Sequence, residues 1–381
     1  MNGEKRTLND ACLRGSTLRI AVIAPPWLAI PPAAYGGTES VLDALCQALV
    51  DAGHEVLLCA SGDSTCPVPR VATVPKALGT EDMQSPAELR HVINAYQAVL
   101  AWGADLVHDH TIVGPFYAAR HPQLSVITTN HGPFDGDLAP LYRDLAWRVP
   151  VIAISHHQAS AADGIPLAGV IHHGVDPRRF PVGRGAGGYA AFLGRMNPAK
   201  GVDTAIRVAR RAGMPLKIAA KMRERAEREY FQEEVEPLLG EGVDYVGEVG
   251  GDEKLALLAD ATCLLNPIVW PEPFGMVMIE ALACGTPVVA TPAGAAPEIV
   301  DDGVTGLLRR DEESLAKAVN EAPSLDRAAC RGAVEARFSA QVMADRHIAV
   351  YQRLASRRSL GPVAAQASTS SKMLSGMSKL A

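Results

Sequence analysis

Several features that would narrow the class of this protein are missing from its sequence. Its seven cysteines are scattered without a CxxC pair, so we expect reduced thiols rather than a disulfide framework or a cysteine zinc site. Residues 1–17 lack the apolar core of a signal peptide, and a cytoplasmic location is expected. The apolar stretch 20–35 contains four prolines, which exclude a single membrane-spanning helix. With 5% aromatic residues, no stacking surface stands out.

The charge balance is mildly acidic. Lys and Arg number 36 and Asp and Glu 42, which gives a net charge of −6 with neutral histidines. This argues against nucleic acid as the main partner. From residue 346 onward, however, there are six Lys or Arg and no acidic residue. A solvated tail is the favoured interpretation, and a peripheral contact with an acidic membrane surface stays open.

What the sequence does contain is a repeated alternation of short apolar strands and amphipathic helices. We expect strands at 18–24, 55–60, 105–110, 125–131, 149–155 and 169–176, and again at 189–194, 215–220, 243–248, 261–267 and 286–291. Each series opens with a strand, a glycine-containing loop and a helix. The first of these helices is expected at 39–52 with Thr38 as N-cap, and the second at 202–213. The pattern is typical of parallel, doubly wound sheets.

The fold class predicted from this pattern is α/β, with two facing Rossmann-like domains. A length of 381 residues fits two or three domains. We expect an N-terminal extension over 1–17, a first domain over 18–178, a second over 179–338, a helix over 339–356 and a disordered tail over 357–381. Because such sheets bind ligands at the carboxyl ends of their strands, the site is expected in the cleft between the domains.

The stretch "GRMNPAKG" (194–201) ends a strand and precedes a helix. Arg195 and Lys200 can converge there on one anion, and the helix dipole adds to the positive field. A diphosphate is the natural ligand for such an arrangement. Taken alone, the stretch fits a surface loop with two solvated cations equally well.

Two glutamates bracket the apolar stretch "PFGMVMI". Pro273 suits a first helical turn, so we expect a helix from about Phe274 to Ala283, with Glu272 just before it and Glu280 two turns in. A carboxylate at Glu280 can accept hydrogen bonds from a vicinal diol such as ribose. Alternatively, Glu280 is a buried structural carboxylate paired with a cation, and Glu272 is an exposed loop acid.

These residues carry a resemblance. "EPFGMVMIEALACGTPVVA" (272–290) is similar to the E-x7-E motif of the retaining glycosyltransferases of family 4, the group 1 glycosyl transferases with the GT-B fold. "YGGTES" (35–40) and "GRMNPAKGVD" (194–203) resemble the glycine loop and the Arg/Lys loop of that family. "IHHGVDPRRF" (171–180) resembles its domain-crossing element, with His173 where Asn is usual, and "PAGAAPEIVDDGVTGLL" (292–308) resembles the segment after its second glutamate. Five motifs in the right order are specific, although each alone is weak.

The resemblance implies a role for each matching position. Glu272 would hold the hydroxyls of the donor sugar, Glu280 the nucleotide ribose, and Arg195 and Lys200 the donor diphosphate. The remaining donor contacts would come from backbone groups, at Gly36, Gly37, Val249, Phe274, Gly275, Met276 and Val277. The family also implies that no metal or other cofactor is needed, because the two cations stabilise the leaving group. The helix at 339–356 would cross back to the first domain.

His131 in "TTNHGPF" matches the active-site histidine of the family, near the reacting centre. It can donate a hydrogen bond or orient the acceptor. Asp109 and His110 end a strand and are expected to face the cleft, where either can help to bind the acceptor. Asp135, in a loop "DGD" (135–137), is a further acceptor-side candidate. That DxD pattern binds Mn²⁺ or Mg²⁺ in the other glycosyltransferase fold, but it does not end a strand here.

Three other histidine pairs invite a test for a metal site, namely His108 with His110, His156 with His157, and His172 with His173. Neighbours along a strand point to opposite faces, so the two adjacent pairs are not expected to chelate one ion. His108 and His110 share a face but need further ligands. No metal site is therefore predicted.

The function implied is a retaining transfer of a hexose from a nucleoside diphosphate sugar, UDP-sugar first among the choices, to a hydroxyl acceptor. The acceptor can be a small molecule, a glycan or a lipid-linked sugar, and neither it nor the oligomeric state is readable from the sequence. Two alternatives remain open: a sugar-nucleotide epimerase of the same fold, and a non-catalytic sugar-nucleotide-binding protein. A phosphorylase would need a pyridoxal phosphate lysine and a much longer chain.

Overall fold

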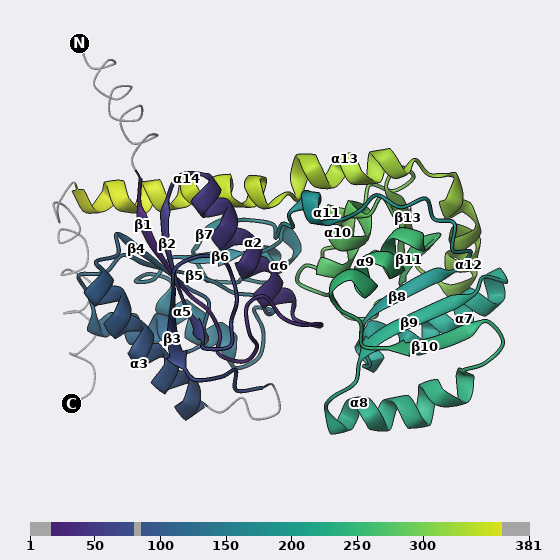
Figure 1. Cartoon of the computed structure of the whole chain (residues 1–381), viewed down its shortest axis with the longest axis horizontal. Helices are drawn as coiled ribbons and strands as arrows, with labels where there is room; N and C mark the ends of the chain where they lie inside the picture. Colours follow the sequence, from purple (N-terminus) through teal and green to yellow (C-terminus); the bar gives the residue numbers. More distant parts are fainter. Residues whose placement is uncertain (1–16, 80–84, 360–381) are drawn as a thin grey trace, which may run out of the picture.

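Two parallel β-sheets, each covered by helices on both faces, make up the computed structural model of this chain (Figure 1). The structure describes residues 17–79 and 85–359. The extension predicted over 1–17 lies outside them except for its last residue, and the tail predicted over 357–381 lies outside them from residue 360 on. The α/β class with two parallel sheets is confirmed.

The first sheet has seven strands in the order β3-β2-β1-β4-β5-β6-β7. Their bounds are β1 Arg19–Ile23, β2 Glu55–Ser61, β3 Arg70–Val74, β4 Leu106–Asp109, β5 Val126–Thr129, β6 Val151–Ala153 and β7 Leu167–Val170. All neighbours pair in parallel. The edge strand β3 is absent from the strands expected from the sequence. Only its last two residues are buried, so it carries little hydrophobic signal.

Helices cover this sheet because alternate residues of its strands point to opposite faces. The helices of this half are α2 Gly37–Asp51, α3 Ser85–Trp102, α4 Gly114–Tyr117, α5 Leu138–Leu145 and α6 His156–Ser160. On β1, Ile20 and Val22 belong to the apolar cluster that contains α2, whereas Ala21 and Ile23 belong to the cluster that contains α3. Both faces are thereby buried, as a parallel sheet requires.

The start of α2 corrects one prediction. The N-cap position is Gly36, and Thr38 lies in the first turn, so the prediction of Thr38 as N-cap is wrong. A Cβ on Gly36 would lie 2.7 Å from Cβ of Pro32. Only glycine fits where the proline-rich loop turns into the helix, and the helix therefore begins earlier than the sequence suggests.

The second sheet has six strands in the order β10-β9-β8-β11-β12-β13. The strands are β8 Ala190–Arg195, β9 Leu216–Lys221, β10 Val243–Gly247, β11 Cys263–Asn266, β12 Val288–Ala290 and β13 Gly306–Leu308. The α-helices are α7 Val202–Ala212, α8 Arg225–Tyr230, α9 Gly251–Asp260, α10 Met276–Ala283, α11 Ala296–Ile299, α12 Glu312–Glu321 and α13 Arg327–Arg337. On β11, Cys263 and Leu265 pack with α7 and α12, and Leu264 packs with α10 and α13.

The chain crosses between the two sheets twice, and the two crossing segments lie side by side. Val175 forms a parallel bridge with Ser339, and the amide of Ala340 donates to the carbonyl of Val175 at 2.7 Å. A Cβ on Gly174 would lie 2.7 Å from the carbonyl oxygen of Ser339, so glycine permits this close approach. The crossings therefore act as one joint between the halves.

After the second crossing, α14 (Ala340–Ser359) runs along the first half, drawn in yellow in Figure 1. Its residues Met343, Val350 and Tyr351 enter the same apolar cluster as Leu42 of α2. The hydroxyl of Tyr351 lies 2.7 Å from Nδ1 of His108 on β4. The last helix of the chain thus completes the core of the first half.

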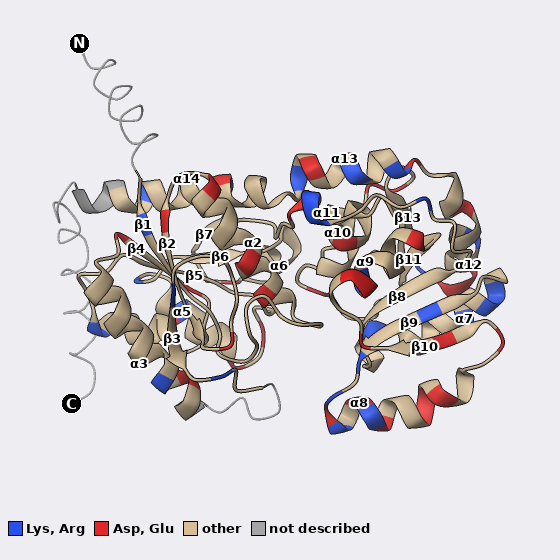
Figure 2. Cartoon of the chain, in the orientation of Figure 1, with Lys and Arg blue, Asp and Glu red and all other residues tan. Residues whose placement is uncertain are grey.

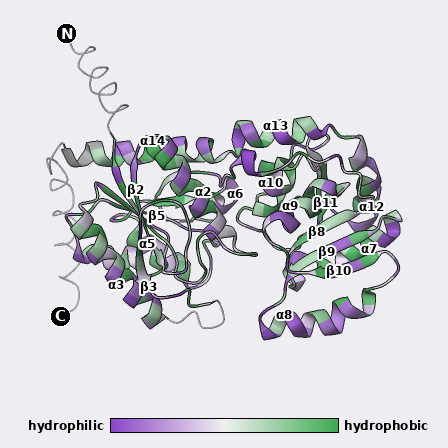
Figure 3. Ribbon diagram, in the orientation of Figure 1, coloured by the Kyte–Doolittle hydropathy of each residue, from purple (hydrophilic) through white to green (hydrophobic). Residues whose placement is uncertain are grey.

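The outer helices carry charges of both signs, for example along α8 and α13 (Figure 2). Helices in both halves combine hydrophilic and hydrophobic residues (Figure 3), as expected where one side packs on a sheet. Among the described residues, no helix combines the length and the apolar character that crossing a membrane would require.

Candidate functional site

A cavity of about 640 Å³ lies between the two halves, at the carboxyl ends of strands from both sheets. The first half contributes the loop before α2, the start of α2 and His131. The second half contributes the ends of β8 and β9, the loop after β10 and the segment 270–280. The volume suits a ligand of nucleotide-sugar size. The cleft expected from the sequence is therefore a real cavity.

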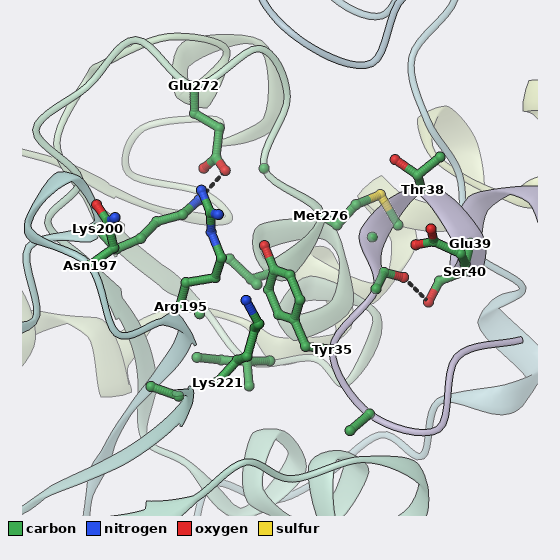
Figure 4. A pocket seen from close by; sticks show the side chains of 18 of the residues that line it. Tyr35, Thr38, Glu39, Ser40, Arg195, Asn197, Lys200, Lys221, Glu272 and Met276 are labelled. Atoms are coloured by element: carbon green, nitrogen blue, oxygen red, sulfur yellow. Dashed lines mark hydrogen bonds and ion pairs between the residues drawn. The ribbon is translucent and has the colours of Figure 1, made fainter. Parts of the chain in front are cut away.

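Arg195 and Lys200 both line this cavity. Arg195 is the last residue of β8, and Lys200 ends a short 3₁₀ turn, Pro198–Lys200, in which the Asn197 side chain caps the amide of Ala199 at 2.9 Å. Gly201, with φ 70°, then leads into α7, and a Cβ there would lie 2.3 Å from the carbonyl oxygen of Pro267. This compact turn brings the two cations to the same wall of the cavity (Figure 4).

Glu272 approaches the same point from the loop before α10. Its Oε1 forms an ion pair with Nζ of Lys200, and its Oε2 is buried without a hydrogen-bond partner. The loop is held from behind by Gly294, where a Cβ would lie 2.2 Å from the carbonyl oxygen of Glu272. Gly275, at φ 103°, turns the chain into the helix. The loop thus aims one free carboxylate oxygen into the site.

The helix after Glu272 starts later than the sequence predicts. α10 spans Met276–Ala283 with Gly275 at the N-cap position, so Pro273 does not occupy the first helical turn. Gly275 has φ 103°, which is not a helical conformation, so the helix begins only after it. Residues with a side chain rarely adopt this conformation, which is why glycine stands here. Phe274, Gly275, Met276 and Val277 all line the cavity, as the sequence predicts.

Glu280 is 6% exposed and lines the cavity from within α10. Its carboxylate is neutralised by Lys254 of α9, with Nζ 2.8 Å from Oε1. The buried-carboxylate interpretation and the ligand-binding interpretation are therefore compatible. Lys254 balances the charge, and Glu280 still faces the cavity.

The N-terminus of α2 faces the cavity from the first half. Gly36 and Gly37 both line it, and a Cβ on Gly37 would lie 3.6 Å from Cγ of Met276. The helix starts of α2 and α10 therefore meet across the site, each with free backbone amides. The amide of Tyr35 donates to Oε1 of Glu248 at 3.1 Å, which joins the loop to the second half.

His131 lines the cavity within a row of histidines, between His110 and His173. Its Nε2 lies 2.9 Å from Nδ1 of His110, and its Nδ1 lies 3.3 Å from Nε2 of His173. Burial lowers the pKa of His131 to about 4, and burial together with neighbouring histidines holds the pKa of His110 and His173 well below the usual range. His131 is therefore a neutral imidazole at pH 7, able to donate or accept a hydrogen bond.

None of the three residues expected on the acceptor side, Asp109, His110 and Asp135, lines the cavity. Asp109 is fully buried and accepts hydrogen bonds from the hydroxyl of Tyr96 at 3.0 Å and from Thr111, so the prediction that it faces the cleft is wrong. Burial raises its pKa to about 7. Asp135 is exposed in its loop and does not line the cavity. His110 is buried behind the cavity wall, where it contacts His131.

Further polar residues line the cavity that the sequence interpretation misses. They are Tyr35, Glu39, Lys221, Arg223, Glu224, Glu227, Glu248, Lys254 and Trp270. Lys221 is the last residue of β9 and pairs with Glu224 and Glu227, and Figure 4 shows it beside Tyr35 and Arg195. Burial raises the pKa of Tyr35 to about 12, so its hydroxyl stays protonated. The rule that ligands bind at strand ends points directly to Lys221.

Val249 lies in the loop between β10 and α9 and also lines the cavity. All of the residues predicted on the donor side thus surround one space. Their roles toward a bound donor remain predictions.

Known families and proteins resemble this chain. Residues 35–179 match the family model described as Glycosyltransferase Family 4, and residues 188–323 match the model described as Glycosyl transferases group 1. The chain is 27% identical to phosphatidyl-myo-inositol mannosyltransferase of Mycolicibacterium smegmatis, over 76% of this chain and 80% of that protein.

Solved structures share the fold. AviGT4, a glycosyltransferase involved in avilamycin A biosynthesis, is 26% identical with a TM-score of 0.71, over 89% of this chain and 98% of that one. HepE of Anabaena, solved in complex with UDP and glucose, is 21% identical with a TM-score of 0.68, over 90% and 99%. These two-domain enzymes place the present fold in the GT-B class.

The buried histidines predict loss of stability in mild acid. Burial lowers the pKa of His91, His131 and His347 to about 4 each, against about 6.5 in an unfolded chain. Their contribution is complete above pH 6.5 and is lost as the pH falls toward 4, at about 1.4 kcal/mol per pH unit for each histidine. Burial raises the pKa of Asp109, Glu39 and Glu88, and these carboxyl groups oppose the trend. The pKa values of four further histidines, His54, His108, His110 and His173, are lowered as well and add to it.

Urea unfolding at pH 7.5 and pH 5 tests this, and the midpoint should be lower at pH 5. A His347→Gln variant should show a shallower dependence on pH. A midpoint that is unchanged or higher at pH 5 would contradict the assignment of these histidines as neutral in the folded protein.

Proposed function

The chain belongs to the group 1 glycosyltransferases of family 4, and from this premise we propose that it transfers a hexose from a nucleoside diphosphate sugar to a hydroxyl acceptor. The transfer would retain the configuration at the anomeric carbon. A UDP-sugar is the proposed donor. The second half would hold the donor, and the first half would hold the acceptor.

The observation that carries this proposal is the state of the cations around the cavity. Lys200, Lys221 and Lys254 each pair with a glutamate. Arg195 forms no ion pair with any residue that the structure describes, and its Nε is buried without a hydrogen-bond partner. Arg195 is half-buried, and a partly desolvated cation without a counter-ion is costly, so an anionic ligand is expected to pair with it. A diphosphate supplies that charge and can accept two hydrogen bonds from the guanidinium.

The remaining donor contacts follow from the same geometry. When a diphosphate binds, Lys200 can turn from Glu272 to the phosphate, which leaves both oxygens of Glu272 free for hydroxyls of the sugar. The amides at the starts of α2 and α10 add positive potential on either side. Glu280, with its charge balanced by Lys254, can accept the two ribose hydroxyls.

The proposed chemistry needs no protein nucleophile. The two glutamates that would contact the donor are each engaged by a lysine, Glu272 by Lys200 and Glu280 by Lys254. The acceptor oxygen would bond to the anomeric carbon on the face from which the phosphate leaves, and a phosphate oxygen would take the acceptor proton. Arg195 and Lys200 would stabilise the charge that develops on the leaving diphosphate. Neutral His131 would orient the acceptor or the sugar by a hydrogen bond.

In this proposal the acceptor approaches the donor from the first half of the protein. The first half reaches the cavity through Trp27, Leu28 and His131. A relative is named for a lipid acceptor, phosphatidyl-myo-inositol. For this chain we propose a hydroxyl acceptor without further restriction, so small molecules, glycans and lipid-linked sugars all belong in an assay. The cytoplasmic location expected from the sequence stays a prediction.

A panel of sugar nucleotides tests the function. UDP-, GDP- and ADP-sugars are compared by their effect on thermal unfolding, and we expect one base to raise the midpoint selectively. Glu280→Gln should weaken this stabilisation because the ribose loses a charged acceptor, whereas Glu313→Gln, whose side chain is 68% exposed, should not.

The stabilising donor is then incubated with and without acceptors. New glycoside together with free nucleoside diphosphate supports the transferase. Conversion of the donor sugar without any glycoside would indicate an epimerase. Binding without any conversion would indicate a non-catalytic protein, and no stabilisation by any member of the panel would refute the donor site.

Replacement of Arg195 tests its role toward the diphosphate. Arg195→Ala should lower kcat/KM by about 10²–10³-fold, the usual cost of removing one donor to a developing anion. The matched control is Arg225→Ala, whose side chain is 88% exposed on α8, and its steady-state kinetics should equal those of the wild type. Equal kinetics for Arg195→Ala and the wild type would remove Arg195 from the mechanism.

Removal of divalent ions tests the proposed independence from metal. Activity should persist in excess EDTA, because Arg195 and Lys200 supply the charge that a metal supplies elsewhere. The measurement is initial rate with EDTA and after addition of Mg²⁺ or Mn²⁺. A loss of activity that Mg²⁺ or Mn²⁺ restores would contradict the proposal.

A further inference from the structure

Outside the donor cavity, three side chains with metal-ligating atoms come together. They are His156, His172 and Glu298, and one ligand atom of each lies within 4.8 Å of the others. None of the three lines the cavity. Among the described residues, this is the one group of three or more such side chains with this spacing. The group takes no part in the proposed donor site, so a separate role can be sought for it.

The three residues come from both halves of the protein. His156 is the first residue of α6, and His172 follows β7, whereas Glu298 lies on α11 in the second half. Each of the two adjacent histidine pairs contributes one member. The sequence interpretation holds that neighbours in a pair cannot chelate the same ion, but one histidine of each pair can meet across the fold.

Glu298 is held firmly in place. Its Oε2 accepts from the amide of His156 at 2.8 Å, and its Oε1 accepts from the amide of His157 at 2.6 Å. Nε2 of His172 lies 2.8 Å from Oε2. These contacts fix the carboxylate at the start of α6, and each oxygen keeps or can regain a lone pair for a further ligand.

His172 is also held in place, because its ring belongs to a cluster with two aromatic rings that contact each other as well. The ring centroids of Phe274 and Phe338 lie 5.8 Å and 5.7 Å from it. His156, in contrast, is exposed, and its ring meets that of His172 edge-on at 5.8 Å. Two ligands are thus positioned by the protein, and the third can move into place from solvent.

We propose that His156, His172 and Glu298 bind one Zn²⁺ ion. Two imidazole nitrogens and one carboxylate oxygen are a ligand set that Zn²⁺ prefers, and three protein ligands leave a fourth, tetrahedral position for water. The ion takes the place of the proton that His172 Nε2 now shares with Glu298 Oε2. That proton is released, or the other tautomer of His172, protonated at Nδ1, binds the ion directly.

Binding here would tie the two halves together. The ion would connect α6 and the segment after β7 to α11, close to the joint at Val175 and Ser339. His172 also contacts Phe274, which lies in the loop before α10 that carries Glu272. The zinc site is separate from Arg195 and Lys200. Zinc binding here is therefore compatible with sugar transfer that uses no metal ion at the donor.

Zinc titration of the full, metal-stripped and tag-free chain tests the proposal. Isothermal titration with ZnCl₂ should show one equivalent bound by the wild type. His156→Ala should weaken this binding at least ~10-fold, since loss of even an outer-shell partner costs ~10–100-fold. His157→Ala is the matched control, because His157 is the next residue on α6 and lies outside the group of three. Its affinity should equal that of the wild type.

Co²⁺ serves as a second probe of the geometry. Visible absorption of the Co²⁺-loaded wild type should show the intense bands of four-coordinate cobalt, and His156→Ala should lose them. The proposal is overturned if the wild type binds no equivalent of Zn²⁺, if His156→Ala binds as tightly as the wild type, or if His157→Ala is weakened equally. Because His156 is exposed, its replacement should leave the thermal midpoint of the metal-free protein unchanged, which separates loss of a ligand from misfolding.

Discussion

The pairing of the two crossing segments is the constraint on which the rest of this structure depends. Val175 and Ser339 lie side by side, and Gly174 permits the close approach of their backbones. Everything in the candidate site lies between the halves that this joint connects. A second tie comes from α14, whose Tyr351 reaches His108 in the first sheet. With these contacts in place, the carboxyl ends of the two sheets face one another, and a cavity forms where each sheet would bind a ligand.

Charge compensation then decides what the cavity can hold. Its glutamates are not a pair of free acids, because Lys200 and Lys254 neutralise Glu272 and Glu280. Arg195 differs, since it has no carboxylate partner in the described part of the chain. Because Arg195 is the one cation among the described residues of the cavity without a carboxylate partner, the cavity favours an anionic ligand. The paired glutamates are then available as hydrogen-bond acceptors. In the proposed function, Glu272 and Glu280 therefore bind hydroxyl groups of the donor. Arg195 stabilises the negative charge that develops on the leaving diphosphate.

Much of the fold was predictable because its signals are local. Alternating apolar strands and amphipathic helices predict two parallel sheets, and the confirmed family resemblance rests on short motifs within 35–308. The misses have local causes as well. The edge strand β3 buries only its last two residues. The start of α2 is shifted by Gly36, where a proline leaves no room for a side chain. The start of α10 is shifted by Gly275, whose φ is positive. Asp109 looked accessible at the end of its strand, but Tyr96 of α3 covers it.

By itself, the sequence determined which residue types stand at the strand ends and helix starts, because periodicity and turn residues act over a few positions. Arg195 and Glu272 stand at such positions, whereas their roles and the identification of His131 came from the family resemblance. Only the tertiary structure decided their partners: Lys254 for Glu280, Lys200 for Glu272, and Glu298 for His172. The last two pairs are separated by 72 and 126 positions along the chain. Such pairings depend on how two sheets pack around a shared joint, and no local pattern encodes the distance between side chains that far apart.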